Sequence, residues 1–105
     1  LNPNYRGRYL GPLQVSYIYL KRYNDAIPVC KKQIKLEPGL FWPYLNLIQC
    51  YIALNREKEA HEVVAEVLKI NPKLSVKYVA KLLSRIEKVP DENLLEALRK
   101  AGLPE

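Results

Sequence analysis

The chain has 105 residues, of which 49% are hydrophobic and 27% are charged, and its formal net charge at pH 7 is +6. This balance excludes a disordered segment and suits a single folded domain. Two cysteines are too few for a disulfide framework. The dense apolar stretch at residues 41–54 is shorter than the ~20 residues of a membrane-spanning helix. We therefore expect a folded, cytoplasmic protein. The start at Leu1, without an initiator methionine, predicts part of a longer chain.

Residue types recur along the chain at an interval of 34 positions. So many matches in one register indicate an internal repeat, which is typical of solenoid architectures. The matching pairs are Leu13 and Leu47, Tyr17 and Tyr51, Ile18 and Ile52, Leu20 and Leu54, Ala26 and Ala60, Ile34 and Leu68, Leu36 and Ile70, and Pro38 and Pro72.

Within each repeat the apolar residues are spaced for two helices. In the first repeat they recur at steps of three and four through residues 10–20 and again through residues 26–34, with a polar break between the two runs. Because Pro12 follows Gly11, we expect the first helix to begin near Gly11 or to bend there. One helical hairpin cannot bury its own apolar face, so each repeat must stack on a neighbour.

These residues resemble the tetratricopeptide repeat, a family of 34-residue helix–turn–helix units. The sequence departs from the small residues that the family favours at Gln14, Gln33 and Ile48. The family spacing of a large apolar residue, Leu, Tyr, Ala, an apolar residue and Pro is met by Leu10, Leu13, Tyr17, Ala26, Cys30 and Pro38, and again by Tyr44, Leu47, Tyr51, Ala60, Val64 and Pro72.

The resemblance implies an all-α solenoid of helical hairpins that ends in a capping pair of helices. In this interpretation residues 1–6 end a preceding repeat, residues 7–40 and 41–74 are two repeats, and residues 75–105 form the C-terminal cap. Such an architecture implies binding to a protein or peptide, with no cofactor and no catalytic role.

The last third of the chain does not follow the 34-residue register, and its apolar spacing predicts a different pair of helices. One helix is expected to start near Ser75 with a capping hydroxyl, and the next to start at Pro90. Gly102 is a suitable stop for the second helix. An atypical terminal unit is expected of a cap that shields the end of a solenoid.

The C-terminal tail, residues 94–104, resembles the C-terminus of bacterial multidomain proteins. In those proteins an adenylate/guanylate cyclase-like domain precedes tetratricopeptide repeats. The resemblance implies a second hypothesis, in which the chain is a regulatory or dimerisation segment of a signalling enzyme. Any catalytic residues would then lie upstream of Leu1.

No group of residues in the sequence indicates catalysis or metal binding. His61 is the only histidine and is expected on an exposed helix face, while Cys30 and Cys50 are expected as buried thiols on neighbouring helices. The four glycines are scattered, so no phosphate-binding loop is present, and no nucleophile has a partner base. We expect a chain without enzymatic activity.

The first helix of each hairpin lines a concave groove in this family, and the resemblance therefore implies a candidate groove for a partner peptide. Tyr19 and Trp42 would anchor the partner, and Asn46 and Gln49 would bind its polar groups. Packing against an upstream repeat or against the cap explains the same residues equally well. The implied lining is Val15, Ile18, Tyr19, Trp42, Leu45, Asn46, Gln49 and Ala53.

A basic stripe, spaced at every fourth residue, is the second candidate surface. It could bind an acidic protein, a nucleic-acid backbone or anionic lipid, although such a run of charge is usually a solvated helix face. The absence of interleaved aromatic residues argues against nucleic acid. The sequence thus favours a protein-interaction module, with homo-oligomers left open. The stripe consists of Lys73, Lys77, Lys81 and Arg85.

Overall fold

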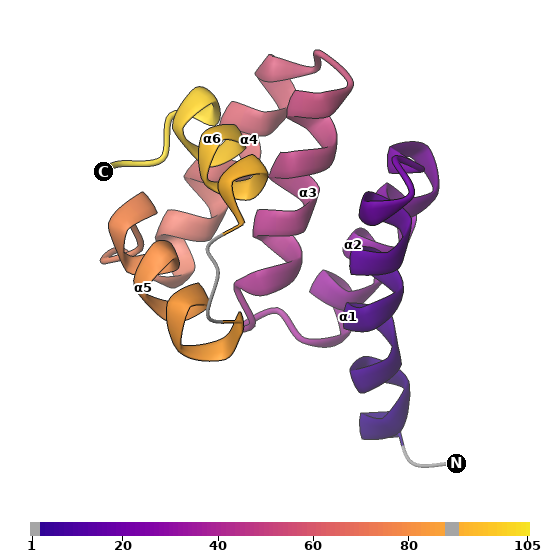
Figure 1. Ribbon diagram of the computed structural model, residues 1–105. Coiled ribbons are helices and arrows are strands. Elements are labelled where there is room, and N and C mark those ends of the chain that lie inside the picture. The colour runs from indigo at the N-terminus through magenta and orange to yellow at the C-terminus, as the bar shows by residue number, and fades with distance from the viewer. Residues whose placement is uncertain (1–2, 88–90) are drawn as a thin grey trace.

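The computed structural model describes the backbone of residues 3–87 and 91–105, and the side chains of residues 10–85 and 91–105. The described chain contains helices and no strand, which confirms the all-α prediction (Figure 1). It measures 40 × 29 × 27 Å. In chain order the helices are α1 (Pro3–Tyr19), α2 (Tyr23–Leu36), α3 (Trp42–Ala53), α4 (Glu57–Ile70), α5 (Val76–Glu87) and α6 (Glu92–Ala101).

The first helix begins earlier than the sequence predicted. α1 is one helix from Pro3 to Tyr19 with Pro12 inside it, so the expected start near Gly11 is wrong. Pro12 removes one intrahelical hydrogen bond, but burial of Leu10 and Gln14 holds both sides of that position in the helix. The boundary expected between residues 6 and 7 consequently falls within α1, and residues 1 and 2 lie outside the described residues.

The turns inside the two hairpins have the same geometry, 34 residues apart. In each turn a residue with φ of 60° precedes an arginine whose N–H donates 2.8 Å to a tyrosine carbonyl five residues earlier. The guanidinium lies over that tyrosine ring, at 5.1 Å and 4.8 Å, and pairs with a carboxylate three residues later. The repeat of sequence is therefore also a repeat of local structure. The residues are Lys21, Arg22, Tyr17 and Asp25 in the first turn, and Asn55, Arg56, Tyr51 and Glu59 in the second.

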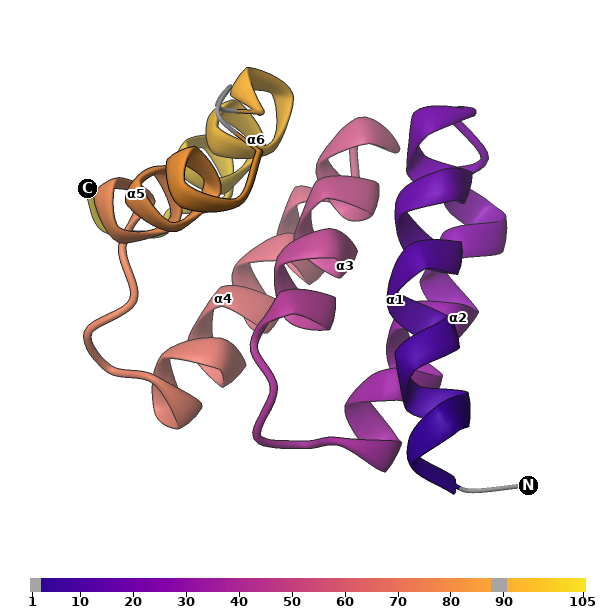
Figure 2. The same cartoon turned by 60° about the horizontal axis from the view of Figure 1, so that its bottom comes forward.

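The hairpins stack so that α2 packs on both α1 and α3, and α3 packs on α4 (Figure 2). Ala26 and Ala60 are fully buried, as expected for small residues where helices approach closely. Cys30 and Cys50 are also fully buried, which confirms them as interior thiols. Their mutual hydrogen bond, together with burial, raises the pKa of the Cys30 thiol, so this sulfur is not a nucleophile at neutral pH.

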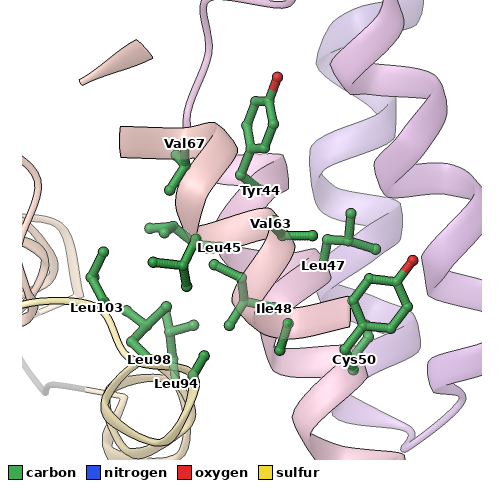
Figure 3. Packing of buried hydrophobic residues seen from close by; sticks show 14 of the residues in the cluster. Tyr44, Leu45, Leu47, Ile48, Cys50, Val63, Val67, Leu94, Leu98 and Leu103 are labelled. Atoms are coloured by element: carbon green, nitrogen blue, oxygen red, sulfur yellow. The ribbon is translucent and has the colours of Figure 1, made fainter. Parts of the chain in front are cut away.

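The C-terminal cap packs across the second hairpin through α6. This helix lies chiefly on α3 and partly on α4, while α5 packs on α6. Figure 3 shows Leu94, Leu98 and Leu103 of the cap beside Leu45 and Ile48 of α3. All five side chains are buried, so the cap shares one hydrophobic core with the repeats.

Side-chain and backbone hydrogen bonds hold the start of α5, the first helix of the cap. The Ser75 hydroxyl accepts from Tyr78 N–H at 3.0 Å, as the sequence predicted for a helix start near Ser75. The first amides of α5 donate to the end of the chain, Val76 to the Pro104 carbonyl and Lys77 to the Glu105 carbonyl.

Helix α6 is capped at both of its ends. Asp91 is the N-cap of α6, whereas Pro90, the expected start, lies outside the described residues. Gly102, with φ of 96°, terminates α6 as predicted.

Candidate partner-binding cavity

A cavity of about 340 Å³ lies between α1, α3 and the cap. We call it the α1–α3 cavity. Its walls come from five helices, α1, α2, α3, α5 and α6, and from two residues outside the helices, Leu40 before α3 and Asp91 before α6. The lining residues are Gly11, Val15, Ile18, Gln33, Leu40, Trp42, Asn46, Gln49, Leu83, Asp91 and Leu94.

The structure places five of the eight groove residues implied by the sequence in this one cavity: Val15, Ile18, Trp42, Asn46 and Gln49. The other three lie elsewhere.

Leu45 is fully buried, because α6 covers this side of α3, and it is therefore a core residue. Tyr19 is 86% exposed and lines neither of the two cavities described here. Ala53 lines the second cavity, of about 270 Å³, which lies between α3 and α6 and shares Gln49 with the first.

A buried row of amide side chains forms the polar part of the cavity wall. Asn46 Nδ2 donates to Gln14 Oε1 at 2.9 Å, and Gln14 Nε2 donates to Gln33 Oε1 at 2.5 Å. Gln14 has no solvent exposure and Gln33 has 5%. These are two positions at which the sequence departs from the family's small residues. The amides occupy the space between α1, α2 and α3, and each forms a hydrogen bond with its neighbour in the row. Such bonds are needed because a buried polar group without a hydrogen-bond partner destabilises the fold.

The cap contributes three lining residues that the sequence did not indicate: Leu83 from α5, Asp91, and Leu94 from α6. Asp91 Oδ1 accepts from the backbone N–H of Leu94 at 3.2 Å. Asp91 is the one ionisable residue among the described residues of the lining. The only signal for these residues in the sequence was the loss of the 34-residue register, which predicts a cap but not where the cap lies.

An aromatic contact holds the indole at the start of α3. The rings of Phe41 and Trp42 are 5.0 Å apart, and Phe41 meets Tyr78 of α5 edge-on at 6.4 Å. Trp42 remains partly exposed, so its ring is fixed by neighbours but still open to the cavity.

His61 has a structural role that the sequence did not predict. The side chain is exposed, as expected, and its Nδ1 also lies at hydrogen-bond distance from the Ala101 carbonyl. This carbonyl is at the end of α6, where helix carbonyls lack intrahelical partners. His61 therefore joins α4 to the cap, together with the Lys100–Glu57 ion pair at 3.6 Å.

The basic stripe forms the outer face of α5 and the turn before it. All four side chains are exposed, and none forms an ion pair with another residue of the described chain. By contrast, Arg22, Arg56, Arg99 and Lys100 all pair with carboxylates. The stripe is thus a surface of unneutralised positive charge, made by Lys73, Lys77, Lys81 and Arg85.

The described ranges contain neither a metal-binding cluster nor a membrane-spanning helix. No group of three or more metal-ligating side chains comes together there. No helix in those ranges has the length and apolar character needed to cross a membrane.

Comparison with known proteins gives one finding. No curated protein matches the chain. The family model of the tetratricopeptide repeat matches residues 17–86, two thirds of the chain, and covers both hairpin turns, α3, α4 and most of α5. Together with the paired turn geometry, this match establishes that the chain belongs to the tetratricopeptide repeat family.

Proposed function

We propose that the chain is a non-catalytic protein-interaction module that binds a peptide segment of a partner protein in the α1–α3 cavity. The observation that carries the proposal is the convergence of Val15, Ile18, Trp42 and Gln49 on one open cavity. Apolar walls with a few fixed polar groups are the usual composition of a binding site.

The size of the cavity limits what enters it. A volume of about 340 Å³ is at the lower end of ligand pockets, so it suits one or two side chains rather than a folded element. The segment would continue along α1, where Val15 is 56% exposed and Tyr19, one turn further, is 86% exposed. Tyr19 is proposed as an outer contact of the bound segment.

The test is a selection of random displayed dodecapeptides on the wild-type chain, followed by affinity measurements with the selected peptides. The double variant Trp42→Ala, Gln49→Ala is expected to lose at least about tenfold in affinity, because an aromatic anchor and a polar contact are removed together. Asn46 is left intact because its amide also stabilises the interior.

The matched control is Leu36→Ala, which removes a 52% exposed apolar side chain that lines neither cavity. This variant should bind the selected peptides as tightly as the wild type does. Equal affinities for wild type and the Trp42→Ala, Gln49→Ala variant would refute the proposal.

A second interaction surface is proposed on a separate observation, the unpaired charge of the basic stripe. Four exposed cations along one helix face complement an acidic partner. The apolar side of α5, including Val79 and Leu83, is buried in the core, so α5 is not free to insert into a lipid surface.

The cyclase context and a bacterial signalling role rest on the tail sequence alone. In the fold, Leu103 is buried in the core and the carbonyls of Pro104 and Glu105 cap α5. Packing of the cap therefore explains the tail residues without a catalytic domain. Regulation or dimerisation of such a domain, and homo-oligomers, have no further support.

A further inference from the structure

Among the residues that the structure describes, the α1–α3 cavity is charged at only one point, although the chain as a whole is basic. The described lining contains a single carboxylate, Asp91, and no Lys, Arg or His. The Asp91 Oδ1 atom is occupied as the N-cap of α6, by the Leu94 N–H. Oδ2 has no hydrogen-bond partner among the residues that the structure describes.

The amide row adds a second acceptor to the same wall. The hydrogen bonds of the row all point the same way: Asn46 donates an N–H to Gln14, and Gln14 donates an N–H to Gln33. Asn46 donates one of its two Nδ2 hydrogens to the interior, and its Oδ1 is an acceptor without a hydrogen-bond partner among the described residues. A carboxylate and an amide oxygen in one small cavity favour a hydrogen-bond donor on the ligand, and the negative charge favours a cation.

The other walls suit the stem of a long side chain. Trp42, Leu83 and Leu94 surround the space, and the indole face can also attract a cation. An aliphatic stem that ends in a cation would contact these apolar groups along its length while its head reaches Asp91.

We propose that the α1–α3 cavity receives a lysine or arginine side chain of the partner segment, with the cation bound to Asp91 and the stem packed on Trp42 and Leu94. This inference rests on the proposed function and names the chemistry of its partner. The net charge of +6 does not oppose it at short range, because the cations of the stripe lie on the side of α5 opposite Leu83.

The decisive variant is Asp91→Asn, which removes the charge and keeps an N-cap of equal quality for α6. The matched control is Glu92→Gln, which makes the same change of charge one residue later, at an exposed position outside both cavities. Circular dichroism and urea denaturation would check that both variants fold.

Peptides selected on the wild type are expected to contain Lys or Arg at one fixed position, and replacing that residue by Gln should weaken binding about tenfold. On Asp91→Asn this preference should disappear, while Glu92→Gln should retain it. If wild type selects peptides with no basic residue in common, or if Asp91→Asn keeps the preference, the inference is wrong.

Either of those results leaves the proposed function standing, provided that the Trp42→Ala, Gln49→Ala variant loses the peptides. Failure of that variant to weaken binding overturns the cavity as a binding site, and the lysine or arginine proposal with it.

Discussion

Asn46 lies at the border between the cavity and the interior of the protein. Its side chain lines the α1–α3 cavity, and its Nδ2 donates to a glutamine that has no access to solvent. The repeat pattern could not reveal this pairing. The residues 34 positions away from Asn46 and Gln14 are Pro12 and Ile48, so the amide pair occurs once, and only the folded chain brings its members together.

The Asn46→Ala variant should therefore be less stable than the wild type. Removing the amide leaves Gln14 Oε1 without its donor in a water-free site, which should lower the free energy of unfolding by about 1–3 kcal/mol. Gln49→Ala, at another position of the same cavity wall, should change it by less than about 0.5 kcal/mol, because the Gln49 side chain makes no hydrogen bond within the described chain. Urea denaturation measures both values. Equal effects of the two substitutions would contradict the buried amide row.

At the scale of whole helices, the two hairpins were predictable because their signals are local. Apolar spacing, the two alanines and the closing prolines all lie within one 34-residue unit. The start of α1 was not predictable, since the hydrogen bond lost at Pro12 had to be weighed against burial of Leu10 and Gln14.

The side chains that the cap contributes to the cavity could not be predicted either. Their position depends on how α6 packs on α3, and the cap does not follow the register that placed the other residues.

The end of the chain is expected to stabilise the first turn of α5. Deletion of residues 103–105 removes a buried leucine and the two carbonyls that accept from Val76 and Lys77. We expect the free energy of unfolding to fall by about 2–4 kcal/mol, with faster amide exchange at the start of α5.

A matched control for this deletion is Glu105→Gln, which keeps the backbone and loses only the exposed ion pair with Arg99. It should cost less than about 0.5 kcal/mol. Unchanged exchange in α5 after the deletion would show that the tail does not cap this helix.

Across the whole molecule, positive charge is distributed unevenly. The net charge is +6, but the lining of the α1–α3 cavity, as far as the structure describes it, contains no cation and one carboxylate. The unpaired cations of the stripe lie on the outer face of α5. The fold separates this basic outer face from a cavity whose described lining has one negative group.

The double variant Lys77→Glu, Lys81→Glu should separate the two surfaces. Because neither lysine has an ion pair in the described chain, the free energy of unfolding should change by less than about 0.5 kcal/mol. Affinity for cavity-binding peptides should stay within about twofold at physiological salt, since the helix diameter exceeds the Debye length of about 8 Å. Calorimetric titration measures this affinity. A large loss of peptide affinity would instead place the stripe in the same binding site.

The claim that a partner segment binds in the α1–α3 cavity is tested most directly by the fluorescence of Trp42. This residue is the only tryptophan of the chain, and it lines the cavity. A selected peptide without tryptophan, titrated into the wild-type chain, should shift the emission to shorter wavelength and saturate at the dissociation constant found by calorimetry. Val15→Glu places a charge at the mouth of the cavity. In this variant the dissociation constant obtained from the fluorescence titration should rise about tenfold or more. Binding seen by calorimetry with unchanged Trp42 emission, and with full affinity in Val15→Glu, would show that the partner segment binds elsewhere.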